Sequence, residues 1–450
     1  MTTSTQYGLI RTLRVRNANV PGVLGTLASA IGSAGANIGN LATVHIAQTH
    51  VVRDIDVQVR DLNHLEDVLH AINDLPGVDV LETRDEVLGM HRGGKIRTVS
   101  RQPVDSIATL RKVYTPGVAE VCRVIAERPE RKRLYTSIAN TIAIITDGTA
   151  VLGLGNIGLA ASMPVMEGKS ALLSQLSGVS GVPILVEAST VEEFVDTVVR
   201  VAPTFGGIHL EDIASPACFE IVDRLRERLP MPVMQDDQDG TAAVVLGAAA
   251  AVCSQLGREL SGQRIGQVGL GAAGQAIADL LMYTTGRPVV GADVQEERLD
   301  RHRSHGGETA DLKEVMASCD IVIATTGVPG LIRKEQVRKG QVVLALSNPD
   351  PEIDPLAALE AGAAMAADGR AVNNVLGYPG IWRGALAAQA TGISRAMLMA
   401  AGEALAGLAP AGELSPNPLD LEVHREVARF VGRAAVASGI GSASGLDELG

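Results

Sequence analysis

Aromatic residues are scarce in this chain of 450 residues, where Phe, Trp and Tyr make up 2% and tryptophan occurs once. Because 46% of the residues are nevertheless apolar, Ala, Val, Leu and Ile must fill the cores. Cysteine is also rare, and no two of the four cysteines have the CxxC spacing of a zinc site. Their wide spacing also argues against a secreted disulfide scaffold and favours reduced thiols in a cytosol. The four are Cys122, Cys218, Cys253 and Cys319.

The chain also lacks an excess of positive charge and a long apolar run. Its formal net charge of −12 argues against nucleic acid as a main partner, because phosphate binding needs a basic face. The longest apolar run, Ala242–Cys253, is too short to span a bilayer. The start of the chain, MTTSTQYGLIRTLRV, shows no signal peptide. We therefore expect a cytoplasmic protein with no membrane contact, and the length predicts two or three domains.

Residues 1–90 predict a small β-α-β-β-α-β unit. Strands are expected at 10–16, 37–47, 51–59 and 78–83, and helices at 23–34 and 64–73. With Asn19-Val20-Pro21-Gly22 leading into the first helix, this unit resembles an ACT domain, which has a ferredoxin-like fold. The resemblance implies a homodimer or higher homo-oligomer and a small amino-acid effector at the seam between copies. A dimerisation module without a ligand is the alternative.

The rest of the chain predicts two further α/β domains, at residues 91–257 and 258–450. A polar, glycine-bearing stretch, 91–103, has the composition of a linker. Two runs of alternating strand and helix patterns follow it, which is typical of parallel sheets covered by helices. The tail from Gly441 onward is expected to be frayed.

Two strings have the GxGxxG pattern. The second, Gly269–Gly274, follows a strand and opens a helix, as in a Rossmann fold, where the helix N-terminus attracts a pyrophosphate. The next strand ends in Asp293, placed to bind the adenosine ribose and to repel a 2′-phosphate, which favours NAD over NADP. A later strand ends in the small residues Thr325, Thr326 and Gly327. The predicted cofactor-binding residues here are Gly269, Gly271, Ala272, Ala273, Gly274, Asp293, Thr325, Thr326 and Gly327. The first string, 153–158, lacks such an acid and is interpreted as a tight turn beside a substrate pocket.

Two carboxylate pairs follow two successive short strands. Glu211-Asp212 comes after one strand and Asp236-Asp237 after the next, so a right-handed crossover brings both pairs to the same sheet edge. Neighbouring strands lie about 4.8 Å apart, and four acids that close need a counter-ion. Oxygen ligands, with only His209 as a nitrogen candidate, suit Mg²⁺ or Mn²⁺ rather than zinc. Capping of the following helices is the alternative, but a cap explains one acid per site.

Six strings in this order resemble the short bacterial malic enzymes, from about residue 92 to residue 391. They are VYTPGVAEVC (113–122), AVLGLGNIG…MPVMEGKSALL (150–173), PTFGGIHLEDI (203–213), MPVMQDDQDGTA (231–242), LSNPDPEI (346–353) and AVNNVLGYPGIWRGAL (371–386). The resemblance implies an α/β fold with a malic-enzyme substrate domain and a C-terminal Rossmann-type NAD-binding domain, preceded here by the ACT domain.

The resemblance also assigns roles to residues of this chain. It implies that Tyr114 and Lys169 are catalytic and contact the substrate, and that Glu211, Asp212 and Asp237 bind the metal. Asp236 is then a neighbour that orients groups or relays a proton. Asn348, Asn373 and Asn374 are expected at the substrate, and Asn348 also at the cofactor, although each asparagine could simply belong to a turn.

The implied reaction is the NAD-linked oxidation and decarboxylation of malate to pyruvate and carbon dioxide. The metal would chelate malate and lower the pKa of its hydroxyl. Lys169, in a mostly apolar stretch, could be desolvated enough to act as a neutral base. The metal would then stabilise the enolate that decarboxylation leaves, and Tyr114 would protonate it.

The metal loop departs from the family pattern His-Asp-Asp-Gln-His-Gly. This chain has Gln235 and Asp239 in place of the two histidines, and Met163 where a lysine is common. These changes predict a less positive pocket and weaker malate binding unless another cation compensates. A different 2-hydroxy acid as substrate, or a catalytically silent homologue that senses an amino acid, are the alternatives.

Overall fold

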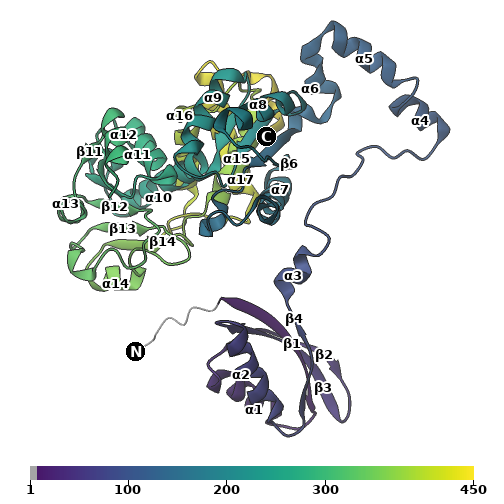
Figure 1. Cartoon of the computed structure of the whole chain (residues 1–450), viewed down its shortest axis with the longest axis vertical. Helices are drawn as coiled ribbons and strands as arrows, with labels where there is room; N and C mark the ends of the chain where they lie inside the picture. Colours follow the sequence, from purple (N-terminus) through teal and green to yellow (C-terminus); the bar gives the residue numbers. More distant parts are fainter. Residues whose placement is uncertain (1–7, 450) are drawn as a thin grey trace. The chain divides into compact units, whose positions relative to one another are not determined.

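The computed structural model describes residues 8–449, which form two compact units that divide between Arg97 and Thr98 (Figure 1). Each unit has its own hydrophobic core. Among residues 8–449, no helix is both long enough and apolar enough to cross a membrane.

The first unit is an antiparallel sheet with two helices. Its elements are β1 (Leu9–Ala18), α1 (Val23–Ser33), β2 (Asn37–Ile46), β3 (His50–Val59), α2 (Leu62–Asn73) and β4 (Val78–Arg84). The strands are ordered β2-β3-β1-β4, which is the ferredoxin-like arrangement predicted from the alternating pattern. The apolar faces of both helices are buried in the core, with Leu27 and Ile31 from α1 and Val68 and Ile72 from α2.

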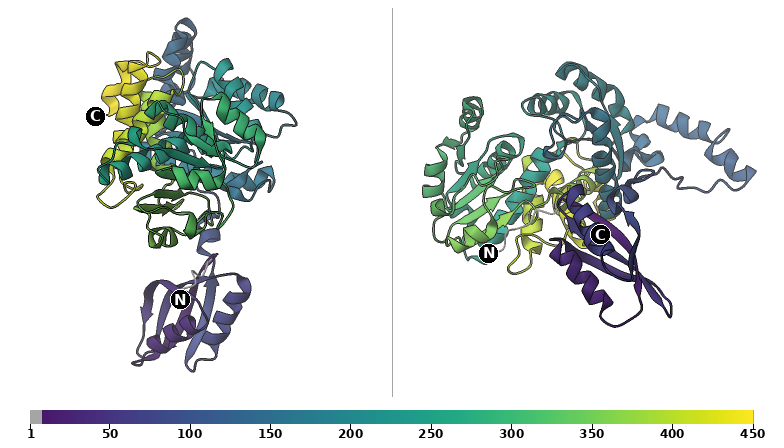
Figure 2. Two further views of the ribbon diagram at one scale, coloured as in Figure 1. Left: turned by 90° about the vertical axis from the view of Figure 1, so that its left-hand side faces the viewer. Right: turned by 60° about the horizontal axis from the view of Figure 1, so that its bottom comes forward.

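The second unit begins with a helical arm. After α3 (Glu86–His91), which ends the first unit, the arm contains α4 (Ile107–Val113), α5 (Val118–Glu127) and α6 (Lys132–Tyr135). No residue between 98 and 140 is buried, and α4 and α5 extend away from the sheets in Figures 1 and 2. Residues of the arm therefore contribute little to the core of this unit.

The first sheet of the second unit is parallel, with the strand order β6-β5-β7-β8. Its strands are β5 (Thr141–Thr146), β6 (Ser180–Leu185), β7 (Gly207–Leu210) and β8 (Val233–Gln235). The helices that connect and follow them are α7 (Met163–Ser177), α8 (Val191–Val201), α9 (Ala217–Arg228) and α10 (Thr241–Gln255). Strands β5, β7 and β8 are fully buried, as the continuous apolar runs of a parallel sheet require.

A second parallel sheet, ordered β11-β10-β9-β12-β13-β14, has the Rossmann arrangement. Its strands are β9 (Ile265–Val268), β10 (Val290–Ala292), β11 (Glu308–Thr309), β12 (Ile321–Ala324), β13 (Val342–Ala345) and β14 (Met365–Asp368). Its helices are α11 (Ala272–Thr285), α12 (Glu296–Ser304), α13 (Leu312–Ser318) and α14 (Pro355–Glu360). The predicted α/β class with parallel sheets is confirmed. The domain boundaries at 90 and 257 stay predictions.

Three C-terminal helices return to the first parallel sheet. They are α15 (Tyr378–Ala387), α16 (Arg395–Leu408) and α17 (Leu421–Ala437). Helices α15 and α17 pack on each other and on α7, while α16 packs on α10. The expected fraying after Gly441 is wrong, because residues 443–449 form a 3-10 helix against α15 and α17. Ser442 anchors this tail by donating its backbone N–H to Ala388, and Leu446 packs against the core.

Candidate active site

The two carboxylate pairs meet at one edge of the first parallel sheet. Strands β7 and β8 are direct neighbours, so Glu211-Asp212 and Asp236-Asp237 both emerge where these strands end. Neither pair caps a helix, because Pro216 precedes α9 and the side chain of Gln235 caps the turn after β8. The capping alternative therefore does not explain the acids.

Glu211, Asp212 and Asp237 form a set of oxygen donors. Each offers one carboxylate oxygen, and these three atoms lie within 4.8 Å of one another. Asp212 Oδ2 is buried and has no hydrogen-bond partner among the residues that the structure describes. A buried carboxylate oxygen without a donor is costly unless a ligand satisfies it. The donor set and this unsatisfied oxygen fit a hard divalent cation such as Mg²⁺ or Mn²⁺.

Asp212 has a backbone conformation that few residue types other than glycine adopt. Its φ angle is 54°, in the left-handed region, where aspartate is one of the better tolerated residues. Its carbonyl accepts the N–H of Ala150 at 3.0 Å, and its own N–H donates to Asp237 Oδ2 at 3.1 Å. Residue 150 begins the segment with the first glycine string, which thus lies beside the carboxylates, as expected for a turn near a substrate pocket.

The turn after β8 is a π-helical turn, Asp236–Gly240, a form often found at functional sites. Gln235 accepts the N–H of Gln238 at 2.7 Å and donates its amide to Asp237 Oδ2 at 2.8 Å. Gly240 leaves room for the acid, since a Cβ there would lie 1.9 Å from Asp236 Oδ1. Gln235 thus orients Asp237 and closes the turn.

Asp239 does not add an unpaired charge to the pocket. Its Oδ2 accepts Arg226 Nη2 at 2.6 Å and the backbone N–H of Gln235 at 3.2 Å. The sequence predicts weaker malate binding unless another cation compensates, and the guanidinium of Arg226 on α9 is such a cation for Asp239. This cation lies on the helix before β8, and no sequence pattern predicted its contact with Asp239.

Lys169, on α7, lies against the carboxylates. Its Nζ bonds Asp236 Oδ2, lies 3.1 Å from Glu211 Oε1, and stands 4.6 Å from the ring centre of Tyr378. Burial alone would lower the pKa of Lys169, but the charges of Asp236 and Glu211 outweigh burial and raise this pKa well above its ordinary value. These neighbours favour the charged form of Lys169, and its role as a neutral base stays a prediction.

The buried acids hold their protons more tightly than ordinary carboxyl groups. Burial, which the charge of Lys169 only partly opposes, raises the pKa of Glu211 to about 7 and that of Asp236 to about 6. Burial and the charges of Glu211 and Asp237 raise the pKa of Asp212 to about 7. One lysine therefore does not balance the cluster, and a bound cation would.

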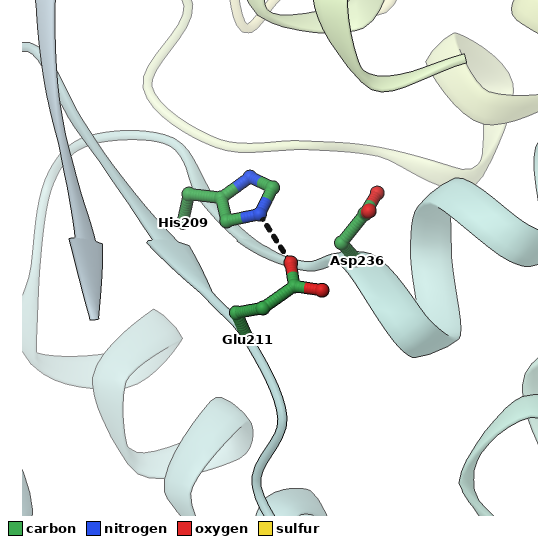
Figure 3. A group of neighbouring side chains, drawn as sticks. All are labelled: His209, Glu211 and Asp236. Carbon is green, nitrogen blue, oxygen red and sulfur yellow. Dashed lines mark hydrogen bonds and ion pairs between the residues drawn. The ribbon is translucent and has the colours of Figure 1, made fainter. Parts of the chain in front are cut away.

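An imidazole and an indole lie behind Glu211. His209 Nε2 is 2.8 Å from Glu211 Oε2, and Trp382 Nε1 is 2.9 Å from His209 Nδ1. Figure 3 shows the imidazole pointing from β7 toward the Glu211 carboxylate, with Asp236 opposite. Burial lowers the pKa of His209 to about 4. From the sequence, His209 was considered only as a metal ligand, and Trp382 and Tyr378 were not predicted near the site.

The three asparagines have different positions. Asn374 donates its amide to Asp236 Oδ2 at 2.8 Å and so belongs to the cluster. Asn373 is exposed, and its side chain accepts the N–H of Val375, as in the turn considered above. Asn348 is exposed beyond the end of β13, at the edge of the Rossmann sheet.

Tyr114 does not lie in the cluster. It follows α4 in the helical arm, and 67% of its surface is exposed. Within the described residues, the cluster therefore contains Lys169, Asn374 and the four acids, and it does not include this tyrosine.

Two glycines of the second string, Gly269 and Gly274, are required by close backbone contacts. A Cβ at Gly274 would lie 1.9 Å from the carbonyl oxygen of Gly269, whereas a Cβ at Gly271 would meet no atom within 4 Å. The space before the N-terminus of α11 is thus open, as a pyrophosphate site requires. Asp293 Oδ2 accepts the N–H of Leu270 at 2.7 Å and lies 3.3 Å from Arg298 Nη1.

The end of β12 lies beside this loop. The backbone N–H of Thr325 donates to Val268, and its hydroxyl accepts the amide of Gln267 at 2.9 Å. Thr326 donates both its N–H and its hydroxyl to Glu352, and Gly327 donates its N–H to Ser347. The predicted nucleotide-binding residues thus line one edge of the sheet, while their contact with a cofactor stays a prediction.

Comparisons with known proteins identify the family. Residues 93–226 match the malic enzyme N-terminal domain, 9–82 an ACT domain, and 240–334 the NAD-binding domain of D-isomer specific 2-hydroxyacid dehydrogenases. The chain is 52% identical over 432 residues to NAD-dependent malic enzyme 1 of Bacillus subtilis (strain 168), covering 96% of this chain and 98% of that protein. The chain belongs to the malic enzyme family.

Other malic enzymes extend the comparison. The NAD-dependent malic enzyme of Geobacillus stearothermophilus is 38% identical over 447 residues, with 92% of each chain covered. The crystal structure of malic enzyme from Pyrococcus horikoshii Ot3 has a TM-score of 0.77 at 37% identity and covers 81% of this chain and 94% of that one. The family resemblance and the predicted three-part organisation of ACT, malic enzyme and NAD-binding domains are confirmed.

Proposed function

We propose that this malic enzyme family member oxidises and decarboxylates malate to pyruvate and carbon dioxide with reduction of NAD. The observation that carries the proposal is the convergence of Glu211, Asp212 and Asp237 beside Lys169. This acid set lies in the same compact unit as a Rossmann sheet whose glycine loop is open for a dinucleotide. A cation site, a lysine and a dinucleotide site together suit hydride transfer from a 2-hydroxy acid.

Glu211, Asp212 and Asp237 would hold the divalent metal. When bound, the metal supplies Lewis-acid chemistry, polarising the substrate hydroxyl and stabilising the negative charge that decarboxylation leaves. Gln235 holds Asp237 in place through its 2.8 Å hydrogen bond, and the left-handed backbone of Asp212 aims a second carboxylate at the same point. The chain thus presents three oxygen donors with little freedom to rearrange.

Lys169 and Asp236 are placed to move a proton. Lys169 is the group expected to take the substrate's hydroxyl proton, and its Nζ already bonds Asp236 Oδ2. Once the acids share their charge with a cation, they hold the proton of Lys169 less tightly, and desolvation favours its neutral form. Asn374 donates to the same oxygen of Asp236 and fixes its orientation. The role of Tyr114 as general acid stays a prediction.

Malate and NAD are the preferred substrates within this proposal. The Arg226–Asp239 ion pair removes the main reason to expect poor binding of a dianion. Asp293 is the predicted ribose ligand, whose carboxylate would repel a 2′-phosphate. The relatives in Bacillus subtilis and Geobacillus stearothermophilus are named NAD-dependent.

A turnover assay with a panel of acids tests the proposal. With NAD and Mn²⁺, malate should give NADH and carbon dioxide in equal amounts and the highest kcat/KM among several 2-hydroxy acids. The Asp237→Asn variant should lose this activity and its response to Mn²⁺. Turnover of another acid but not of malate would contradict the substrate assignment. Absence of any turnover would favour the amino-acid-sensing alternative.

The homo-oligomer, the cytoplasmic location and an amino-acid effector of the ACT domain stay predictions. If the ACT domain is regulatory, deletion of residues 1–90 should abolish the response of malate turnover to added amino acids while leaving basal turnover intact. Loss of the oligomer on deletion, measured by light scattering, would instead favour a purely structural role.

A further inference from the structure

A buried chain of hydrogen bonds connects the only tryptophan of the sequence to a proposed metal ligand. Trp382, His209 and Glu211 are 0%, 0% and 3% exposed, and they are joined end to end by contacts of 2.9 and 2.8 Å. None of the roles derived above uses Trp382 or His209. Both side chains are nevertheless buried aromatic rings with polar nitrogen atoms, and they lie directly behind the acid cluster.

The chemistry of the indole fixes the state of the imidazole. An indole N–H can only donate, so Nδ1 of His209 must be the acceptor and cannot carry a proton. Nε2 then carries the hydrogen and donates it to Glu211 Oε2. The imidazole consequently has no lone pair left for a metal, although His209, Glu211 and Asp236 have ligand-type atoms within 4.8 Å of one another.

This donation restricts Glu211. Because Oε2 is tied to His209, the carboxylate plane is set, and Oε1 is the oxygen that faces Lys169 at 3.1 Å. Metal-ligating carboxylates generally need such outer hydrogen bonds to hold their orientation.

The surrounding backbone makes room for this arrangement. A Cβ at Gly207, two residues before His209, would lie 2.3 Å from the indole ring, so a glycine is needed for Trp382 to reach the imidazole. Tyr378, one helical turn before Trp382 on α15, packs edge-on against the imidazole with ring centres 5.7 Å apart. These contacts hold the rings from two sides.

We infer that Trp382 and His209 act as positioning residues that fix the orientation of Glu211 and thereby set the affinity for the divalent metal. The inference rests on the ligand role of Glu211 in the proposed function. Trp382 acts only through His209, since its N–H selects the tautomer that can donate to Glu211.

Direct Mn²⁺ binding to the full-length protein, followed by electron paramagnetic resonance of the free ion, tests this relay. His209→Leu removes the donor to Glu211 and should weaken Mn²⁺ binding by about 10- to 100-fold. Trp382→Phe keeps a ring but removes the N–H, and should weaken binding in the same direction. His209→Gln, whose amide can donate to Glu211, should restore binding to within about threefold of the wild type.

A double-mutant cycle separates the relay from simple packing. If Trp382 acts through His209, adding Trp382→Phe to His209→Leu should change the Mn²⁺ dissociation constant by less than about twofold. Independent, multiplying effects would overturn the relay, as would wild-type Mn²⁺ affinity in His209→Leu. Thermal unfolding of each metal-free variant identifies any that fail to fold, and His209→Gln remains as the conservative probe in that case.

The same assay distinguishes failure of the relay from failure of the proposed function. Wild-type Mn²⁺ affinity in Asp237→Asn would reject the ligand set on which both depend. The His209 and Trp382 variants could lose Mn²⁺ affinity in the expected coupled way while the wild type does not turn over malate. That result would support the relay and reject the proposed malate oxidation.

Discussion

Binding of the metal should depend steeply on pH, because two of its proposed ligands titrate near neutrality. The pKa values of Glu211 and Asp212 are both raised to about 7 in the metal-free site, and a cation binds only their ionised forms. A group with a pKa of about 7 goes from about nine-tenths ionised at pH 8 to about one-tenth at pH 6. Each group therefore weakens Mn²⁺ binding about tenfold over this interval, and the two together weaken it about 100-fold.

Titration calorimetry at pH 6, 7 and 8 measures this effect. In buffers of different ionisation enthalpy at pH 6, binding should release close to two protons per Mn²⁺, falling toward zero at pH 8. Asp212→Asn removes one titrating ligand and should reduce the change in affinity to about tenfold. Asp223→Asn, an exposed acid on α9, is the matched control and should leave it unchanged. A change of less than about threefold in the wild type would refute the reasoning.

Three further predictions concern charge around the site. Arg226→Gln removes the ion pair of Asp239 and should raise the KM for malate about 3- to 10-fold. The control is Arg224→Gln, because Arg224 pairs with Glu192 and Glu220 instead, and it should leave this KM unchanged. Equal KM values in both variants would contradict the proposal that Arg226 compensates the charge of Asp239. Asp293→Asn keeps an acceptor for the N–H of Leu270 but removes the negative charge. The kcat/KM with NADP, divided by that with NAD, should therefore rise about tenfold or more. An unchanged ratio would reject the assignment of Asp293 to the ribose. Lys169→Met should abolish turnover yet bind Mn²⁺ at least as tightly as the wild type, because it removes a cation that competes for the acids; retained turnover would exclude Lys169 as the base.

The raised pKa values also predict how the metal-free fold responds to pH. Glu211 and Asp212 bind more protons in the folded than in the unfolded chain between about pH 4 and pH 7, so stability falls as the pH rises through this window. The metal-free Tm should therefore be higher at pH 6 than at pH 8, with a smaller difference in Asp212→Asn. Added Mn²⁺ should reverse the order, since it binds the ionised acids. A metal-free Tm that rises with pH would contradict the assignment.

Features that depend on local pattern could be predicted from the sequence. Alternating strands and helical spacing gave the elements of the first unit to within one or two residues, as the strand expected at 51–59 and found at His50–Val59 illustrates. Consecutive strands of an α/β domain are usually neighbours in the sheet, and this rule correctly predicted that Glu211 and Asp236 lie at one sheet edge. Both inferences use only short-range geometry and connection rules, which leave few alternatives.

Features that depend on the reach of single side chains could not be predicted. The pairing of Arg226 with Asp239 is decided by which way a long side chain leaves α9. The charge state of Lys169 depends on ångström distances to Asp236 and Glu211. The contact of Trp382 with His209 joins residues 173 positions apart, a separation that no local pattern encodes.

The return of α15 to the first parallel sheet makes this half of the enzyme a discontinuous domain, interrupted by the whole Rossmann sheet. His209 and Asp236 are synthesised early, but their partners Trp382 on α15 and Asn374 before it follow more than a hundred positions later. During synthesis from the N-terminus, the acid cluster therefore lacks part of its support until the nucleotide-binding sheet has already been made. A chain cut between β14 and α15 would therefore contain the nucleotide-binding sheet but lack Asn374 and Trp382, which contact the acid cluster and His209.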